Sequence, residues 1–144
     1  MLEDAKILLV DDEKDFLDAL SERLGTRGIK VSTAENGVEA VDKVDNEQYD
    51  AIILDMFMPE LDGIETLRKI LKKNPDLQVI LLTGHASLDK GIEAMKEGAM
   101  DFLEKPADIE KLMQQIKDAK AKRLLLTEKK MEEKLEKILK SKSW

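Results

Sequence analysis

The chain has 144 residues, which suffice for one buried core and a short appendage but hardly for two domains. Charged residues make up 38% of it and the formal net charge is −7, which argues against general attraction to nucleic acid or anionic membranes. It contains no cysteine, which excludes disulfides and thiolate metal sites and favours a reducing compartment. The acidic start MLEDAKILLV lacks the pattern of a signal peptide, and no stretch reaches transmembrane length, so we expect a cytoplasmic location.

Apolar runs of strand length alternate along the chain with segments whose apolar residues recur at helical spacing. The first half predicts strands at residues 6–10, 29–34 and 50–55, separated by helices at 12–28 and 36–48. Gly25 or Gly28 can end the first helix, which carries on one face Phe16, Leu17, Leu20 and Leu24. Asn36 is the expected N-cap of the second helix, which carries on one face Val38, Val41 and Val44.

The second half of the chain continues this alternation. It predicts a helix at residues 60–73, a strand at 78–84, a helix at 87–99, a short strand at 100–106 and a fifth helix from 107. The inward residues of the helix at 60–73 are expected to be Ile64, Leu67, Ile70 and Leu71. The helix at 87–99 is expected to begin at a Ser87 cap and to align Leu88, Ile92 and Met95.

Strict alternation of five strands and five helices implies a parallel sheet, because parallel strands need crossover connections, and these turn right-handed. The first, third and fourth strands are almost uninterrupted apolar runs, as expected when both faces of a strand are buried. We therefore predict an α/β, doubly wound, flavodoxin-like fold with five parallel strands in the order 2-1-3-4-5. A closed barrel of eight units would need more strands and helices than the chain contains.

Acidic residues stand at the ends of two strands that this order makes neighbours. Ligands of such sheets bind at the carboxyl ends of the strands, where the strand order reverses. Asp11 and Asp12 follow the first strand and Asp55 ends the third, so the three carboxylates should converge. Crowded like charges are costly unless a cation holds them, and an oxygen-only site suits Mg²⁺. Solvated loop carboxylates are the ordinary alternative for each aspartate taken alone.

Thr83 and Lys105 lie at the ends of the remaining two strands of the predicted sheet. An Asp carboxylate is a known covalent acceptor of phosphoryl groups. A cation such as Mg²⁺ together with the Lys105 ammonium can neutralise phosphoryl oxygens, and the Thr83 hydroxyl can donate a hydrogen bond to them. Taken alone, either residue has a simpler explanation, as a strand-end hydroxyl or a surface charge. Together with the aspartates they indicate a phosphoryl-accepting site.

These residues lie in LLVDDE, ILDMFMPELDG, LLTGHA and DFLEKP, in that order and at strand ends. In this respect residues 5 to about 119 resemble the receiver domain of bacterial two-component response regulators. The segment LLTGHASLDKGIEAMKEGAMDFLEKP looks most like receivers that precede sigma-54-dependent activator domains. The resemblance implies that Asp55 accepts a phosphoryl group from a phosphohistidine on a sensor histidine kinase or phosphotransfer protein. It also implies a Mg²⁺ site formed by Asp12, Asp55 and the backbone carbonyl of Phe57, with Asp11 helping through water.

The same resemblance implies roles for residues around the acceptor. Lys105 would contact the phosphoryl oxygens, and its peptide bond to Pro106 is expected to be cis. Thr83 would move toward the phosphoryl group and Phe102 would follow as an aromatic switch. Phe57, two residues after the acceptor, could tune the lifetime of the phosphorylated form by shielding it from water. His85, the single histidine, is expected to be a loop residue that at most tunes access to the phosphoryl group.

Residues 120–144 form a predicted helical extension that is basic. They hold nine basic and four acidic residues, a formal charge of +5, which leaves −12 for residues 1–119 because the whole chain carries −7. Leu124, Met131, Leu135 and Ile138 fit a short coiled-coil seam in which Glu128 occupies one position. Three interpretations stay open: a dimerising helix, a helix folded back on its own acidic domain, and a linker from a longer regulator. Direct nucleic-acid binding is disfavoured, because glutamates interrupt the basic face and no helix-turn-helix follows.

The predicted organisation is thus a receiver domain at residues 1–119 and a helical extension at 120–144, a coiled coil or linker. The predicted function is a phosphorylation-activated signalling switch that alters partner binding or dimerisation, and an enzyme only in assisting its own phosphorylation and dephosphorylation. The alternative is a constitutive interaction or dimerisation module that has the receiver fold but does not use phosphorylation. A phosphohydrolase acting on small molecules would need a segment that covers its substrate, and no insertion after a strand is long enough for one.

Overall fold

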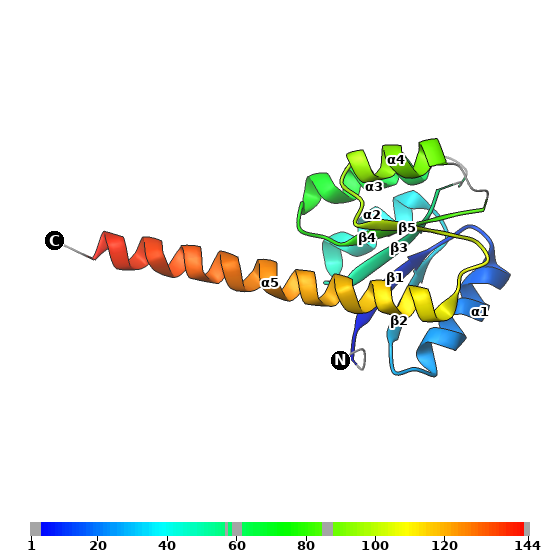
Figure 1. The fold of residues 1–144 in the computed structure, drawn as a ribbon, viewed down its shortest axis with the longest axis horizontal. Helices are drawn as coiled ribbons and strands as arrows, with labels where there is room; N and C mark the ends of the chain where they lie inside the picture. The colour runs from blue at the N-terminus through cyan, green and yellow to red at the C-terminus, as the bar shows by residue number, and fades with distance from the viewer. Residues whose placement is uncertain (1–3, 57, 59–61, 85–87, 143–144) are drawn as a thin grey trace.

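The computed structural model describes residues 4–56, 58, 62–84 and 88–142. Its strands form one five-stranded parallel sheet in the order β2-β1-β3-β4-β5, with helices on both faces (Figure 1). The strands are β1 (Lys6–Val10), β2 (Lys30–Ala34), β3 (Ala51–Asp55), β4 (Val79–Thr83) and β5 (Asp101–Glu104). The helices are α1 (Lys14–Gly25), α2 (Gly37–Asn46), α3 (Gly63–Lys73), α4 (Leu88–Lys96) and α5 (Ile109–Ser141). The predicted fold class, strand order and long terminal helix are confirmed.

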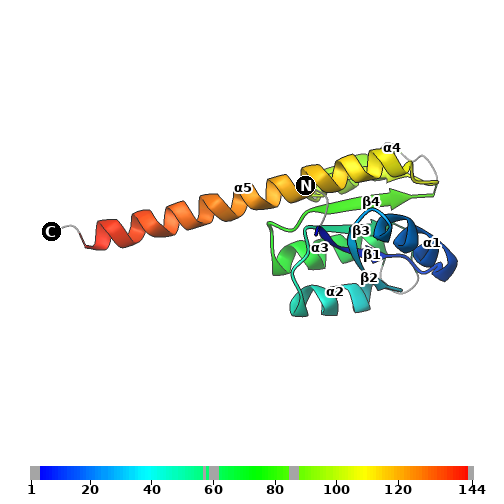
Figure 2. The same cartoon turned by 90° about the horizontal axis from the view of Figure 1, so that it is seen from below.

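The sheet divides the interior into two apolar cores. Alternate residues of each strand point to opposite faces, so a strand between two helical layers must be apolar along its whole length. Every residue of β3 and β4, and all of β1 after Lys6, is buried. One core packs against α1 and α5 and the other against α2, α3 and α4. Figure 2 shows the same molecule turned by 90°, with α5 running past the sheet.

Capping side chains fix where several helices begin. The Asn36 Oδ1 atom accepts a hydrogen bond from the Glu39 N–H at 2.8 Å, which confirms the predicted N-cap of α2. Asp62 caps α3 in the same way through the Glu65 N–H at 2.9 Å. Asp108 accepts from two backbone N–H groups at the start of α5. The predicted Ser87 cap lies outside the described residues.

In α2 and α4 the large residues that the spacing places on one face are not all buried, although Val41 and Val44 of α2 pack partly against the core. Val38 of α2 is 53% exposed, while Gly37 and Ala40 are buried. In α4, Ile92 and Met95 are 44% and 43% exposed, while Ala94 is buried against the sheet. In both helices small residues occupy the buried positions, which lets the helix backbone approach the sheet closely and turns the larger side chains toward solvent. In α1 and α3 the leucines and isoleucines of the predicted faces lie in the core, except Leu71, which is partly buried against it, as is Phe16.

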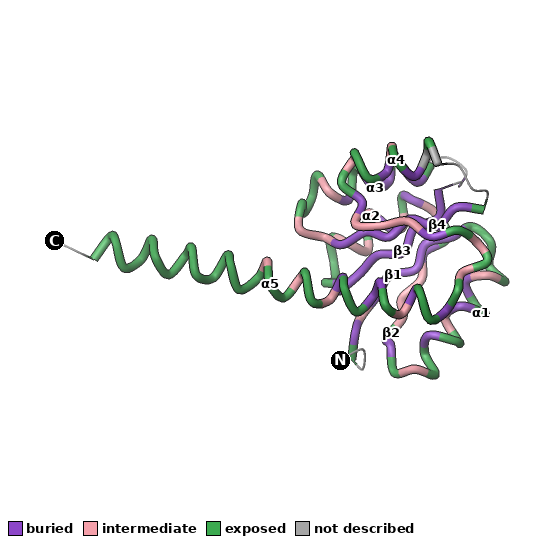
Figure 3. The backbone as a smooth tube through the Cα atoms, in the orientation of Figure 1, coloured by how far each residue is buried: buried purple, intermediate pink, exposed green. Residues whose placement is uncertain are grey.

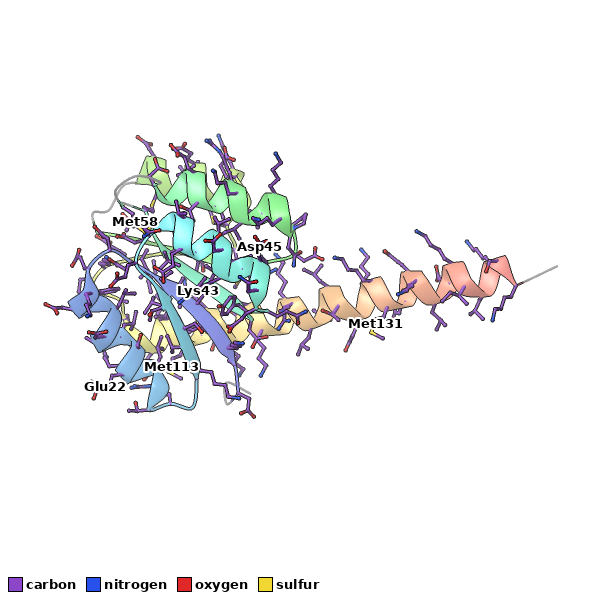
Figure 4. All side chains as sticks on the ribbon, turned by 180° about the vertical axis from the view of Figure 1, so that it is seen from behind. Glu22, Lys43, Asp45, Met58, Met113 and Met131 are labelled. Atoms are coloured by element: carbon purple, nitrogen blue, oxygen red, sulfur yellow. The ribbon has the colours of Figure 1, made fainter. Side chains whose placement is uncertain are left out.

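We call residues 4–119 the receiver body and residues 120–142 the extension. Ala119 is the last buried residue of α5, and the helix then projects beyond the sheet, as the exposed tube in Figure 3 shows. Between the extension and the ends of α2 and α3 lies a groove of about 480 Å³, remote from the carboxyl ends of the strands. Figure 4 labels Met131 on this projecting part. Among the described residues, none of the helices has the length and apolar content that crossing a membrane requires.

Candidate functional site

Three carboxylates meet at the carboxyl end of the sheet. Asp11 and Asp12 directly follow β1 and Asp55 ends β3, and these two strands pair side by side. One carboxylate oxygen from each of the three residues lies within 4.8 Å of the others. Asp11 and Asp55 are buried, whereas Asp12 is exposed. The predicted convergence of these residues is therefore present, with one carboxylate open to solvent.

Lys105 bridges the two buried aspartates. Its ammonium nitrogen lies 2.6 Å from Asp11 Oδ2 and 3.7 Å from Asp55 Oδ2, and its side chain is 15% exposed. Burial by itself lowers the pKa of Lys105, but the hydrogen bond to Asp11 and the charges of Asp55, Asp11 and Glu13 outweigh it, so the net pKa is raised. Lys105 therefore stays an ammonium ion at physiological pH and supplies a fixed positive charge beside Asp55.

Backbone contacts hold the acidic residues in place. The Asp11 N–H donates to the Ala34 carbonyl at 3.1 Å, and Asp11 Oδ1 accepts from the Glu13 N–H at 2.9 Å. Behind Asp55, the chain packs against Gly63, whose N–H donates to the Met56 carbonyl at 2.9 Å. A Cβ atom at Gly63 would lie 2.5 Å from Met56 Cα and 2.7 Å from the Asp55 carbonyl oxygen, so only glycine permits this approach.

Thr83 and Lys105 come from the neighbouring strand ends. Thr83 ends β4 and is buried, and its carbonyl accepts a hydrogen bond from the Lys105 N–H at 2.7 Å. The peptide bond between Lys105 and Pro106 is cis, as predicted. Lys105 Nζ also lies 4.3 Å from the centre of the Phe16 ring, a cation–π contact. The four strand ends thus contribute a carboxylate cluster, a hydroxyl residue and an ammonium group to one edge.

Phe102 lies on β5, half-buried beneath α4. A Cβ atom built on Gly91 of α4 would lie 2.9 Å from the ring atom Cζ of Phe102, so the ring packs directly against a helix that has no side chain there. The backbone of Phe102 is held as well, because its N–H donates to Asp101 Oδ1 at 2.8 Å. Gln115 of α5 donates to Asp101 Oδ2 at 2.9 Å. Phe102 is therefore placed where α4, β5 and α5 meet.

Two predicted site residues, Phe57 and His85, lie outside the described residues. Two neighbours of the site were missed from sequence. From sequence, Phe16 is expected only on a helix face, and Gly63 has no predicted role. The apolar spacing that includes Phe16 does not indicate its contact with Lys105. The two residues are far apart in sequence and are brought together only by the order of the strands. The signal for Gly63 was available, since a glycine in the first turn of a helix is costly unless close packing requires it.

The donor set at this edge fits a hard divalent cation. All three candidate groups are carboxylates, without histidine or cysteine, and at least one of them is open to water. Mg²⁺ prefers oxygen ligands and keeps several of its waters, so a partly exposed carboxylate cluster suits it. Asp12, Asp55 and Asp11 are the described residues that would hold the ion.

The fold and this edge define a class of protein: a doubly wound α/β domain with an acidic cluster and a lysine at its topological switch point. The chain belongs to the response regulator receiver family, since the model of the response regulator receiver domain matches residues 7–117. The transcriptional regulatory protein ZraR of Klebsiella oxytoca is 40% identical over 119 residues, which are 83% of this chain and 27% of ZraR. The C4-dicarboxylate transport transcriptional regulatory protein DctD of Rhizobium meliloti is 35% identical over 122 residues, 85% of this chain and 26% of DctD.

The chain thus spans about a quarter of the length of these curated relatives. Among solved structures, a response regulator receiver domain protein from Clostridium thermocellum is 40% identical with a TM-score of 0.81. That match covers 85% of this chain and 98% of the other. The predicted membership of the receiver family is therefore confirmed.

Proposed function

We propose that the chain is a phosphorylation-activated signalling switch in which Asp55 accepts a phosphoryl group from a sensor histidine kinase or a phosphotransfer protein. The observation that carries the proposal is the position of Lys105, whose Nζ lies 3.7 Å from Asp55 Oδ2 and 2.6 Å from Asp11 Oδ2. A phosphoryl acceptor needs a nucleophilic carboxylate and positive charge for the incoming oxygens. Membership of the receiver family supports the same function.

In the proposed reaction a carboxylate oxygen of Asp55 attacks the phosphorus of a phosphohistidine. The new P–O bond forms as the P–N bond breaks, and the electron pair of that bond stays on the imidazole nitrogen, which can then take a proton. Lys105 would pair with the transferred oxygens, and the Thr83 hydroxyl would donate a hydrogen bond to one of them. This chemistry would take place in the cytoplasm, as the sequence predicts.

Mg²⁺ is the proposed cofactor, and it supplies charge neutralisation for the phosphoryl oxygens when bound. Asp12 and Asp55 would hold it, together with the backbone carbonyl of Phe57, while Asp11 would act through water. The exposure of Asp12 supports this division of roles, because an ion that keeps several waters needs a ligand facing solvent. The buried Asp11 already has Lys105 and the Glu13 N–H as partners, which supports its indirect role.

The proposed output is a change in the face where α4, β5 and α5 meet. Phosphorylation adds charge and three acceptor oxygens beside Thr83. Movement of Thr83 toward these oxygens would free space for the Phe102 ring, which presses against Gly91 of α4. Among the α4 residues whose burial is described, Ile92 and Met95 are exposed large apolar residues, and a partner could bind them. The chain would be an enzyme only in assisting its own phosphorylation and dephosphorylation.

The test is intact-protein mass after incubation with acetyl phosphate and Mg²⁺, with Asp55→Asn as the variant. We expect one added phosphoryl group in the original chain, none in Asp55→Asn, and none after Mg²⁺ is removed with a chelator. Asp50→Asn is the matched control, because Asp50 is also a buried carboxylate. It lies just before β3, at the amino end of the strand, whereas Asp55 lies at its carboxyl end. That control should still accept the group.

The outcome that contradicts the proposal is equally definite. A control receiver whose aspartyl phosphate hydrolyses slowly should show the adduct under the same conditions. If it does and this chain shows none, the constitutive interaction module becomes the better interpretation. If Asp55→Asn still gains a phosphoryl group, another residue is the acceptor. Steady turnover of an added phosphoester would favour hydrolase chemistry instead.

A further inference from the structure

The extension exposes a concentration of apolar side chains. Of the nine large hydrophobic residues that are exposed in the described part of the chain, six lie on it. They are between 43% and 68% exposed: Leu124, Leu125, Met131, Leu135, Ile138 and Leu139. All described residues from 127 onward are exposed. A helix without tertiary contacts is only marginally stable, and clustered apolar side chains on its surface indicate a partner.

Four of these side chains fall on one line along the helix. Leu124, Met131 and Ile138 are seven residues apart, and Leu135 follows Met131 by four. Glu128 lies in the same line, four residues after Leu124 and three before Met131. We call these five residues the seam. A charged residue within an apolar seam is costly unless the partner places something suitable opposite it.

Ion pairs set the direction in which the seam faces. Arg123 donates to Asp50 Oδ1 at 2.6 Å and to Gln48 Oε1 at 3.0 Å, and Lys130 pairs with Asp76. These contacts turn one side of the helix toward the receiver body. Each of the next residues, Leu124 and Met131, points about 100° further around the helix. The seam therefore lies beside the contact with the body, where Met131 lines the groove and is still 68% exposed.

We infer that the seam binds a second copy of this chain in antiparallel orientation. In a parallel pair in register, Glu128 would face Glu128 of the second copy, and like charges within a seam repel. An antiparallel pair that sets Leu124 opposite Leu135 of the second copy brings Glu128 opposite Met131. Lys134 of the second copy then lies one turn from Met131, within reach of the Glu128 carboxylate.

The charge of the two regions favours the same orientation. The extension segment 120–144 carries +5 and residues 1–119 carry −12. Both orientations bring the two basic helices together, but a parallel pair would also place the two acidic bodies side by side. An antiparallel pair lays each basic helix toward the acidic body of the other copy, so the long-range fields attract. Such a two-fold contact is isologous and closes with two copies.

This inference goes beyond the proposed function and does not depend on it. The seam lies on the projecting helix and shares no residue with the acidic cluster at the carboxyl end of the sheet. Failure of Asp55 to accept a phosphoryl group would leave the inference intact. Failure of the seam to associate would likewise leave the chemistry at Asp55 unaffected.

Cysteine cross-linking distinguishes the two orientations, because the chain has no cysteine of its own. Leu124→Cys and Leu135→Cys are made separately and oxidised mildly, alone and as a mixture. In the antiparallel pair neither variant should cross-link alone, whereas the mixture should give a disulfide-linked dimer. Efficient cross-linking of Leu124→Cys with itself would overturn the antiparallel orientation. Both positions are exposed, so the fold should persist, and circular dichroism checks this.

Charge reversal supplies the second measurement. Sedimentation equilibrium should give a dimer for the original chain. Glu128→Lys and Lys134→Glu should each raise the dissociation constant of the dimer about tenfold. The double variant with both reversals should recover the original dissociation constant, because the pair between copies is restored. In a parallel pair Lys134→Glu has little effect and the double variant gives no rescue. A chain that stays monomeric at every soluble concentration also overturns the inference.

Discussion

The receiver body and the extension share one helix but are stabilised in different ways. In the body, α5 buries Leu112, Ile116 and Ala119 completely against the sheet. In the extension the same helix presents Leu124, Leu135 and other apolar residues to solvent (Figure 3). The body therefore gains its stability from burial within one chain. The extension depends on helix propensity, on contacts with the body such as the ion pairs of Arg123 and Lys130, and on whatever covers its seam.

This difference shows which properties of the chain depend on its concentration. Burial inside one chain is independent of how many copies are present, whereas a surface completed by a second copy follows mass action. The acidic cluster lies wholly within the body, so its chemistry should be the same in a monomer and a dimer. The orientation of two copies should instead respond to the charges on the extension.

The largest expected difference in the free energy of unfolding is between two leucine-to-alanine variants of α5, one in the receiver body and one in the extension. Leu112 is fully buried, and Leu112→Ala should lower the free energy of unfolding by about 2–5 kcal/mol through lost transfer energy and a residual cavity. Leu135 is 56% exposed, and Leu135→Ala should change it by less than about 0.5 kcal/mol in dilute protein. Urea denaturation at low concentration measures both. Equal losses would mean that the extension is packed within its own chain.

The size of the residues on the buried face of a helix decides whether the sequence could predict that face. Where large apolar residues fill the contact with the sheet, as Leu17, Leu20 and Leu24 do in α1, their spacing reveals the buried face. In α2 and α4 the contact is filled by small residues such as Ala40 and Ala94. Spacing of large residues then identifies the helix but not its rotation, because close approach of the backbone is not visible in hydrophobicity.

The candidate site was predictable to the extent that it lies at strand ends. Asp11, Asp55 and Thr83 end or follow strands, so the strand order alone brings them to one edge. Contacts from helices were not predictable in this way. The meeting of Lys105 with Phe16 depends on the tilt of α1 over the sheet, and neither residue indicates it in the sequence.

The junction between the receiver body and the extension is held by the ion pair of Arg123 with Asp50. Arg123→Ala removes the charged partner of Asp50, whose side chain is only 9% exposed and keeps the Lys6 N–H as a donor. The substitution should cost about 1–3 kcal/mol because a buried carboxylate loses a charged hydrogen bond. Lys130→Ala is the matched control, since it also removes one cation. The side chain of Lys130 is 67% exposed, so the loss there should stay below about 1 kcal/mol.

Urea denaturation gives both values, and hydrogen exchange of the extension shows where the loss acts. In Arg123→Ala the amides after residue 119 should exchange faster, because the helix is no longer held at its base. If both variants lose the same small amount, the extension is not anchored through Asp50, and its direction relative to the body is set by the helix alone.

A smaller effect is expected at the edge of the body, where Phe16 touches the site. Its ring lies 4.3 Å from Lys105 Nζ, and a cation–π contact contributes about 0.5–1 kcal/mol. Phe16→Leu should therefore lower the rate of phosphorylation by acetyl phosphate about two- to fivefold, because Lys105 is less well held. Phe16→Trp keeps an aromatic face and should retain the rate. An equal loss in both variants would indicate packing rather than cation–π contact.

The smallest change in stability is expected in α4, the element of the body that most resembles the extension, with Ile92 and Met95 both exposed. Gly91→Ala adds a Cβ atom 2.9 Å from Cζ of Phe102, so the ring must move outward. Alanine in a helix gains about 0.8–1 kcal/mol over glycine, which should offset most of the cost of displacing the ring.

Gly25→Ala is the control for this change, because a Cβ atom there has no atom within 4 Å and only the helix gain remains. Gly25→Ala should raise the free energy of unfolding by about 0.5–1 kcal/mol, while Gly91→Ala should leave it nearly unchanged. The two measurements together isolate the energy of moving the Phe102 ring. Aromatic NMR signals of Phe102 should shift only in Gly91→Ala. Because Phe102 lies on β5 and Asp55 on β3, with β4 between them, phosphorylation should proceed at its original rate while binding at the α4 face changes. A slowed phosphorylation in Gly91→Ala would mean instead that the position of the Phe102 ring also affects the transfer step itself.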